Sequence, residues 1–119
     1  MYESDKPKTY KHLDVSTLHV TEDDIELLEM DFQRGGGEHT KRRVEPSCLI
    51  VHSKYPEGFF VYVSDDDGVA ANEPECMRMF GYSAAMIALM ALARREYCIY
   101  LRVDVDGARY KDLETFERS

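Results

Sequence analysis

The sequence of 119 residues has no tryptophan, only three cysteines and no hydrophobic run long enough to cross a bilayer. Its first residues, MYESDKPKTYK, contain no apolar stretch of the kind that a signal peptide carries. Cys48, Cys76 and Cys98 are odd in number and widely spaced, which fits neither a disulfide framework nor a zinc site. We therefore expect buried thiols in a cytoplasmic protein.

Basic residues are also scarce, with 15 Lys and Arg against 23 Asp and Glu and a formal net charge of −8. This excess opposes binding to nucleic acid or to an anionic membrane and favours a cationic partner. Hydrophobic residues make up 44% of the chain, enough to bury one modest core. We expect a loose polar arm over residues 1–9 and a single domain over residues 10–119.

Hydrophobic periodicity predicts alternating strands and helices along this domain. In the first half we expect a strand from Tyr10 that becomes irregular near Ser16, a helix capped by Thr21 that ends near Arg34, and a hairpin over residues 47–64. A loop over 64–75 follows, with a short helical turn at 76–80. The second half then continues with a helix capped by Ser83, a strand over 98–107 and a short return strand at 108–110. The order β-α-β-β-α-β predicts the α+β class: a ferredoxin-like two-layer sandwich with an antiparallel sheet of four to five strands and two helices on one face.

Such a sandwich leaves one face of its sheet uncovered. Alternation along residues 58–63 and in the last strand predicts that Phe60, Tyr62 and Tyr100 lie on the open face. An apolar aromatic patch favours a homodimer or a protein-binding surface, unless the C-terminal segment from Tyr110 onward folds back over it. Stacking of RNA bases is disfavoured, because carboxylates follow both aromatic strands.

Acidic residues concentrate in two short stretches. TEDDIELLEMD holds six carboxylates and no base, and Asp65–Asp67 follows the hairpin. The candidate partner-binding residues are Glu22, Asp23, Asp24, Glu26, Asp65, Asp66 and Asp67. The functional interpretation is an anionic surface that docks on a basic groove of a nucleic-acid-handling protein, and the alternative is an ordinary solvated helix face.

Enzymatic chemistry has little support in the sequence. Asp65–Asp67, Asp104 and Asp106 could supply oxygen ligands for Mg²⁺ or Ca²⁺. Their sequence lacks the calcium-loop pattern, however, and solvated turns explain these aspartates more simply. We expect no catalytic residue, no metal ligand and no cofactor. The rival hypothesis is a small metal-assisted enzyme built on Asp14, His19, Asp65 and Asp104. Asp14, Ser16 and His19 also offer the residue types of a hydrolytic triad, although triads draw their members from separate segments.

The string YKHLDVSTLHVTEDDIELLE, with GFFVYV and GYSAAMIALMALARREYCIYLRVDVDG, resembles a family of short bacterial proteins of unknown function from plasmids, prophages and other mobile elements. The likeness covers residues 10 to 113 and implies a setting in the bacterial host cytosol rather than a chemistry. By size and charge the chain looks like anti-CRISPR and anti-restriction inhibitors. We therefore expect a non-enzymatic inhibitor that blocks a basic surface of a host complex, with a structural homodimer as a further alternative.

Overall fold

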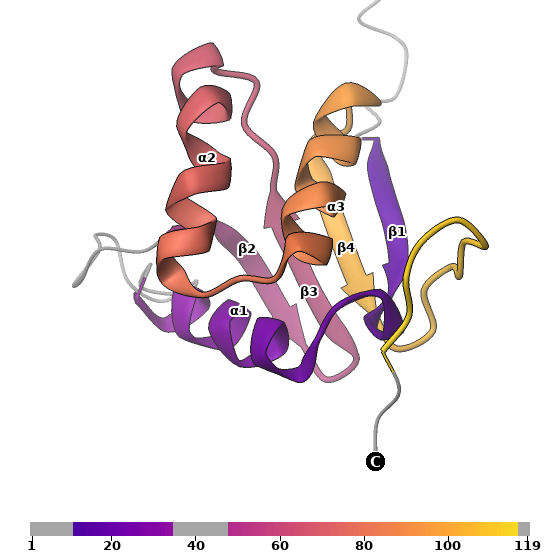
Figure 1. Ribbon diagram of the computed structural model, residues 1–119. Helices are drawn as coiled ribbons and strands as arrows, with labels where there is room; N and C mark the ends of the chain where they lie inside the picture. The colour runs from indigo at the N-terminus through magenta and orange to yellow at the C-terminus, as the bar shows by residue number, and fades with distance from the viewer. Residues whose placement is uncertain (1–10, 35–47, 117–119) are drawn as a thin grey trace, which may run out of the picture.

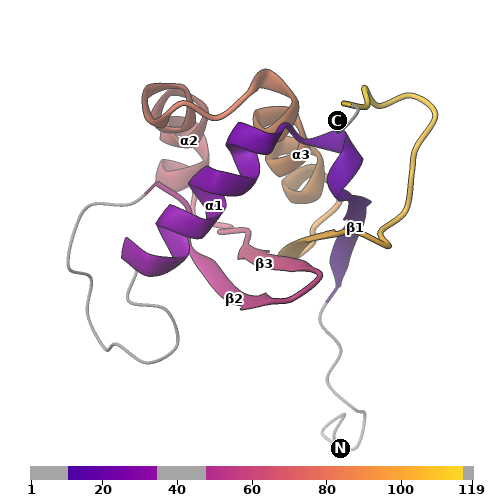
Figure 2. The ribbon, with the colours of Figure 1, turned by 90° about the horizontal axis from the view of Figure 1, so that it is seen from below.

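The computed structural model describes residues 11–34 and 48–116, and these form one sheet with three helices packed against it (Figure 1). The strands are β1 (His12–Ser16), β2 (Val51–Tyr55), β3 (Gly58–Tyr62) and β4 (Tyr100–Asp104). The helices are α1 (Glu22–Arg34), α2 (Asp67–Phe80) and α3 (Ala84–Arg95), and the 3₁₀ turn η2 (Thr17–His19) joins β1 to α1. Figure 2 shows the helices on one side of the sheet. The predicted α+β class and two-layer sandwich are confirmed.

The strand order is β1-β4-β3-β2, with β1 parallel to β4 and both other pairs antiparallel. The prediction of a purely antiparallel sheet is therefore wrong for its first strand, which lies at an edge. The predicted return strand at residues 108–110 does not form either. Ala108 contributes one main-chain bond, in which its carbonyl accepts from the Ser16 N–H at 2.9 Å.

Helix α1 begins with a reciprocal cap. The Thr21 hydroxyl accepts from the Asp24 N–H, and the Asp24 carboxylate accepts from the Thr21 N–H, both at 3.0 Å. Leu28 is fully buried and anchors the inner face of the helix. The helix extends to Arg34 as predicted, whereas the predicted N-terminal arm, the glycine connector at 35–37 and the basic run at 41–43 lie outside the described residues.

Helix α2 corrects the prediction of a loop over residues 64–75. The Asp66 carboxylate caps it by accepting from the Val69 N–H at 3.0 Å, and the helix continues through Pro74. Gly81 ends it in the left-handed conformation at φ 104°. Only two of its side chains are buried, so the sequence shows no apolar stripe that would have revealed the helix.

Helix α3 is capped by Ser83 as predicted and contributes four buried side chains to the core. The predicted hairpin also forms, with β2 extending to Tyr55. The largest fully buried side chains are Val15, His19, Val20, Leu28, Leu49, Val61, Met77, Met86, Leu89, Met90, Leu101 and Val103. The core therefore lies between the sheet and the helical layer. No helix in the described part of the chain is long and apolar enough to span a bilayer.

The segment after β4 passes the outer edge of β1 and lies beside α3 (Figures 1 and 2). It approaches β1 so closely that a Cβ on Gly107 would lie 2.2 Å from the Val15 carbonyl oxygen. Leu113 packs against the core, and the Phe116 N–H donates to the Leu18 carbonyl at 2.7 Å. The alternative that this segment covers the open sheet face is therefore wrong.

Candidate functional site

The sheet face that turns away from the helices carries a row of aromatic rings. Phe60 and Tyr100 meet edge to face at a centroid distance of 6.0 Å, and Tyr62 lies 6.3 Å beyond Tyr100. His12 and His52 extend the row, 5.9 Å from Phe60 and 5.3 Å from Tyr100. The structure thus brings together the three aromatic residues that strand alternation places on this face. Aromatic pairs of this geometry stabilise the fold by more than the burial of their surface alone.

Arg102 occupies the centre of a charge network on the same face. Its guanidinium contacts Asp14 at 2.9 Å and Asp104 at 2.8 Å, and its Nε donates to the Tyr55 hydroxyl at 2.9 Å. The Tyr55 hydroxyl donates in turn to Asp104 at 2.5 Å. This bond lowers the pKa of Asp104, while burial raises the pKa of Tyr55 to about 12. Both carboxylates are therefore ion-paired within the molecule, although the single positive charge of Arg102 offsets only one of their two negative charges.

The acidic residues near the helices behave differently. Glu22, Asp23 and Glu26, here called the α1 acidic cluster, are exposed. Asp65–Asp67, here called the loop acidic cluster, is exposed as well, although Asp66 also caps α2. Within the described part of the chain none of these six carboxylates forms an ion pair. Both clusters therefore expose negative charge that no residue of the described ranges pairs.

Asp24 does not belong to this surface, although the sequence placed it there. Its side chain is fully buried, and it accepts from both the N–H and the hydroxyl of Ser83, at 2.8 and 2.5 Å. Asp31 is buried too, where it accepts from the N–H groups of Cys48 and Leu49. Two of the six carboxylates in the acidic stretch hold the fold together and are not available to a partner.

The two acidic clusters lie at opposite ends of α3 (Figure 1). Asp24 links the beginning of α1 to Ser83, at the beginning of α3. Arg94, in the last turn of α3, donates from Nε to the Ser64 carbonyl at 2.9 Å, next to the loop acidic cluster. A helix of 12 residues is about 18 Å long. A partner that binds both clusters must therefore span this length.

A pocket of about 320 Å³ adjoins the loop acidic cluster. It is lined by Tyr62, Val63, Ser64, Asp65, Arg94, Tyr97, Cys98 and Ile99, and we call it the Tyr62–Tyr97 pocket. The Arg94 guanidinium pairs with Glu73 at 3.0 Å, so its charge is compensated. Its Nη2 atom is covered and has no hydrogen-bond partner among the described residues.

Tyr97 at this pocket has an unusual conformation. It has φ 61°, and its N–H donates to the Arg94 carbonyl where α3 ends. Glycine normally occupies this left-handed position, as Gly81 does at the end of α2. A residue with a Cβ pays about 1–2 kcal/mol there. The residue is 88% exposed, so burial of the side chain does not offset that strain.

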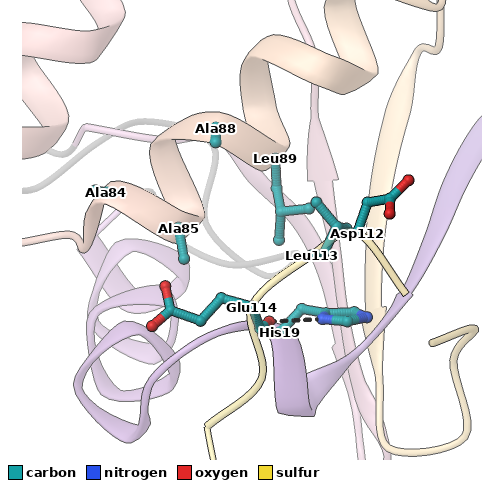
Figure 3. A pocket seen from close by; sticks show the side chains of 8 residues that line it. All are labelled: His19, Ala84, Ala85, Ala88, Leu89, Asp112, Leu113 and Glu114. Atoms are coloured by element: carbon teal, nitrogen blue, oxygen red, sulfur yellow. Dashed lines mark hydrogen bonds between the residues drawn. The ribbon is translucent and has the colours of Figure 1, made fainter. Parts of the chain in front are cut away.

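Figure 3 shows a second pocket, of about 240 Å³, between α3 and the C-terminal segment. His19 lies at its base, where Nδ1 contacts the Glu114 carbonyl at 2.8 Å and Nε2 accepts from the Tyr110 N–H at 3.0 Å. These partners require the neutral ring with its proton on Nδ1. His19 therefore fastens the C-terminal segment, and its nitrogens are occupied.

The residues proposed for a metal-assisted enzyme do not converge. Asp14 and Asp104 are joined through Arg102, His19 binds the C-terminal main chain, and Asp65 lies at the pocket beside Arg94. In the described ranges no group of three or more His, Cys, Asp or Glu side chains is placed to hold a metal ion. The residues of the hydrolytic-triad alternative have separate partners as well. Ser16 caps η2 by accepting from the Leu18 N–H, Asp14 pairs with Arg102, and His19 binds the C-terminal main chain.

The cysteines are only partly as expected. Cys98 is buried, whereas Cys48 and Cys76 are half-buried and line a shared pocket of about 410 Å³. Burial and the adjacent Cys76 thiol raise the pKa of Cys48. A raised pKa keeps this thiol protonated and unreactive as a nucleophile.

The molecule is thus a small α+β module with an aromatic row on the outer face of its sheet and an acidic cluster at each end of α3. Residues 12–118 match the family model described as "Family of unknown function (DUF5983) C-terminal domain", and the chain belongs to that family. This confirms the expected membership of an uncharacterised family. Neither the curated proteins nor the solved structures contain a match.

Proposed function

We propose that this chain is a protein-interaction module that binds a basic surface of a partner through its two acidic clusters. The observation that carries the proposal is the distribution of charge compensation. Both carboxylates of the sheet-face network are ion-paired to Arg102, whereas the α1 and loop acidic clusters have no ion-pair partner among the described residues. Unpaired charge of one sign favours and accelerates association with a surface of opposite sign.

The specific role we propose is that of an inhibitor from a mobile genetic element, of the anti-CRISPR or anti-restriction type, acting in the bacterial cytoplasm. A basic groove that binds a nucleic-acid backbone would accept carboxylates spread over the roughly 18 Å of α3, because both are extended arrays of negative charge. The small size and the charge of −8 support this role by analogy.

The test is capture of a host complex and displacement of its nucleic acid. The double variant Asp23→Lys/Glu26→Lys should weaken capture strongly. The matched control Glu57→Lys/Glu75→Lys changes the net charge equally at exposed sites outside both clusters and should retain capture. Binding should also weaken as ionic strength rises. Equal loss in both variants, salt-independent binding, or a captured complex that keeps its nucleic acid would contradict the proposal.

A second candidate function is a structural homodimer formed through the open sheet face. The observation in its favour is that this face is aromatic and that both of its network carboxylates are paired with Arg102, so two copies would repel each other less there than at the acidic clusters. The mass in solution tests it. Tyr62→Asp and Tyr100→Asp should each convert a dimer to a monomer, and a wild-type monomer would exclude this function.

A further inference from the structure

The Tyr62–Tyr97 pocket combines aromatic walls with an acidic rim. Tyr62 is 36% exposed and Tyr97 is 88% exposed. Asp65 lines the same pocket and has no ion-pair partner in the described ranges, and Asp66 and Asp67 follow it directly. Two exposed tyrosines and one carboxylate thus line the pocket.

The conformation of Tyr97 points independently to a role in binding. Its left-handed backbone strains any residue other than glycine, and its exposed ring gains little from packing. An exposed aromatic ring held at such a cost is typical of a residue that contacts a ligand or partner. Tyr97 also stands at the end of α3, a fixed position within the fold.

We propose that this pocket binds an arginine side chain of the partner, an inference that rests on the proposed function and identifies what the loop acidic cluster recognises. A guanidinium stacks on tyrosine rings by cation–π attraction and pairs with a carboxylate at the same time. Arg94 does not oppose this cation, because Glu73 compensates its charge at 3.0 Å. Asp65 supplies the carboxylate at the rim.

Two other occupants are less favoured. A nucleobase would also stack on the tyrosines, but its phosphates would meet Asp65, Asp66 and Asp67. A second copy of the chain would bring a further acidic surface to an acidic rim. Charge complementarity therefore selects a basic protein segment.

The experiment compares a Gly-Arg repeat decapeptide with the corresponding Gly-Lys peptide, measured by calorimetry at fixed ionic strength. Charge alone barely distinguishes the two peptides, whereas stacking favours arginine. The wild-type protein should bind the arginine peptide about fivefold more tightly. Tyr97→Gly should abolish that preference and leave the weaker, charge-driven binding of both peptides.

Tyr97→Gly is informative because glycine suits this backbone, so the variant should unfold at the same or a higher temperature than wild type. Tyr62→Leu provides a second test of the pocket, and Met79→Ala, at a residue 79% exposed on α2, is the control that should retain the preference. An unchanged preference in Tyr97→Gly, or tighter binding of single-stranded RNA than of the arginine peptide, would overturn the inference. If the wild type shows no preference for the arginine peptide, this inference is wrong. If Asp23→Lys/Glu26→Lys then also loses binding to both peptides, the proposed function still stands, because the acidic clusters bind basic segments by charge alone.

Discussion

The carboxylate of Asp24 accepts two hydrogen bonds from Ser83, 59 residues later in the chain, and so joins the beginning of α1 to the beginning of α3. Asp24→Ala removes both bonds together with half of the α1 cap. We expect a loss of roughly 2–4 kcal/mol in the free energy of unfolding. Asp23→Ala, at the exposed neighbour, should change it by less than about 0.5 kcal/mol. Urea denaturation of both variants tests this; equal effects would contradict the clamp.

Acid sensitivity should depend on Asp104. The hydrogen bond from Tyr55 holds the pKa of Asp104 below its ordinary value of 3.8. A lowered pKa in the folded state means that the stabilisation is fully present above pH 3.8 and is lost as the pH falls through the lowered value. Asp104→Asn should therefore be less stable at neutral pH and should show a shallower loss of stability in acid. Denaturant titrations at several pH values measure the slope, and parallel slopes would count against this role.

Alkaline sensitivity should depend on Tyr55. Its pKa is raised from 10.0 to about 12, so its contribution is present below pH 10 and is lost as the pH rises through 12. Tyr55→Phe removes the ionising group. The stability difference between wild type and this variant should shrink across that interval, and a constant difference would refute the assignment.

Gly107 should tolerate no side chain. The Cβ of an alanine there would lie 2.2 Å from the Val15 carbonyl oxygen, so the C-terminal segment must move away from β1. We expect Gly107→Ala to lower the free energy of unfolding by about 2 kcal/mol or more. Gly68→Ala is the control, because its Cβ would meet only the Asp66 side chain, at 3.1 Å. It should change the free energy of unfolding by no more than about 1 kcal/mol, because the Asp66 carboxylate has to shift by only a few tenths of an ångström.

His19 should control the attachment of the C-terminal segment. His19→Ala leaves the Tyr110 N–H and the Glu114 carbonyl without their partner, at a cost of roughly 2–4 kcal/mol. Trypsin should then cut faster after Arg109 and Lys111. His52→Ala, at an exposed histidine, should leave the cleavage rate unchanged. Unaltered cleavage in His19→Ala would show that other contacts hold the segment.

The elements that the sequence predicted correctly have local signals. Thr21 and Ser83 are side-chain caps within one turn of the helix they begin, and the alternation in β4 identifies its buried face. Helix α2 has such a cap in Asp66, but Gly68 and Pro74 disfavour helix and only Glu73 and Met77 are buried, so no apolar stripe supports the cap signal. The edge position of β1 has no local signal, since its pairing depends on a strand at the other end of the chain.

The candidate site was predictable in its composition but not in its arrangement. Strand alternation identified Phe60, Tyr62 and Tyr100, whereas the burial of Asp24 depends on a distant serine that the sequence does not place. Tyr97 was missed altogether. A signal was available in the sequence: the helix from Ala84 ends in Arg-Glu-Tyr-Cys, which contains no glycine that could adopt the left-handed conformation.

The parallel pairing of β1 with β4 constrains how the protein is made. Asp14 and Arg102, paired across these strands, are 88 residues apart, and β4 is the only neighbour of β1 among the described strands. During synthesis the β2–β3 hairpin and the helices can associate first, whereas β1 waits until the end of the domain has left the ribosome. Contacts so distant in sequence form slowly. A product terminated before β4 lacks the partner of β1, so it would display an unpaired strand and an uncovered core. Both are features that cellular quality control recognises.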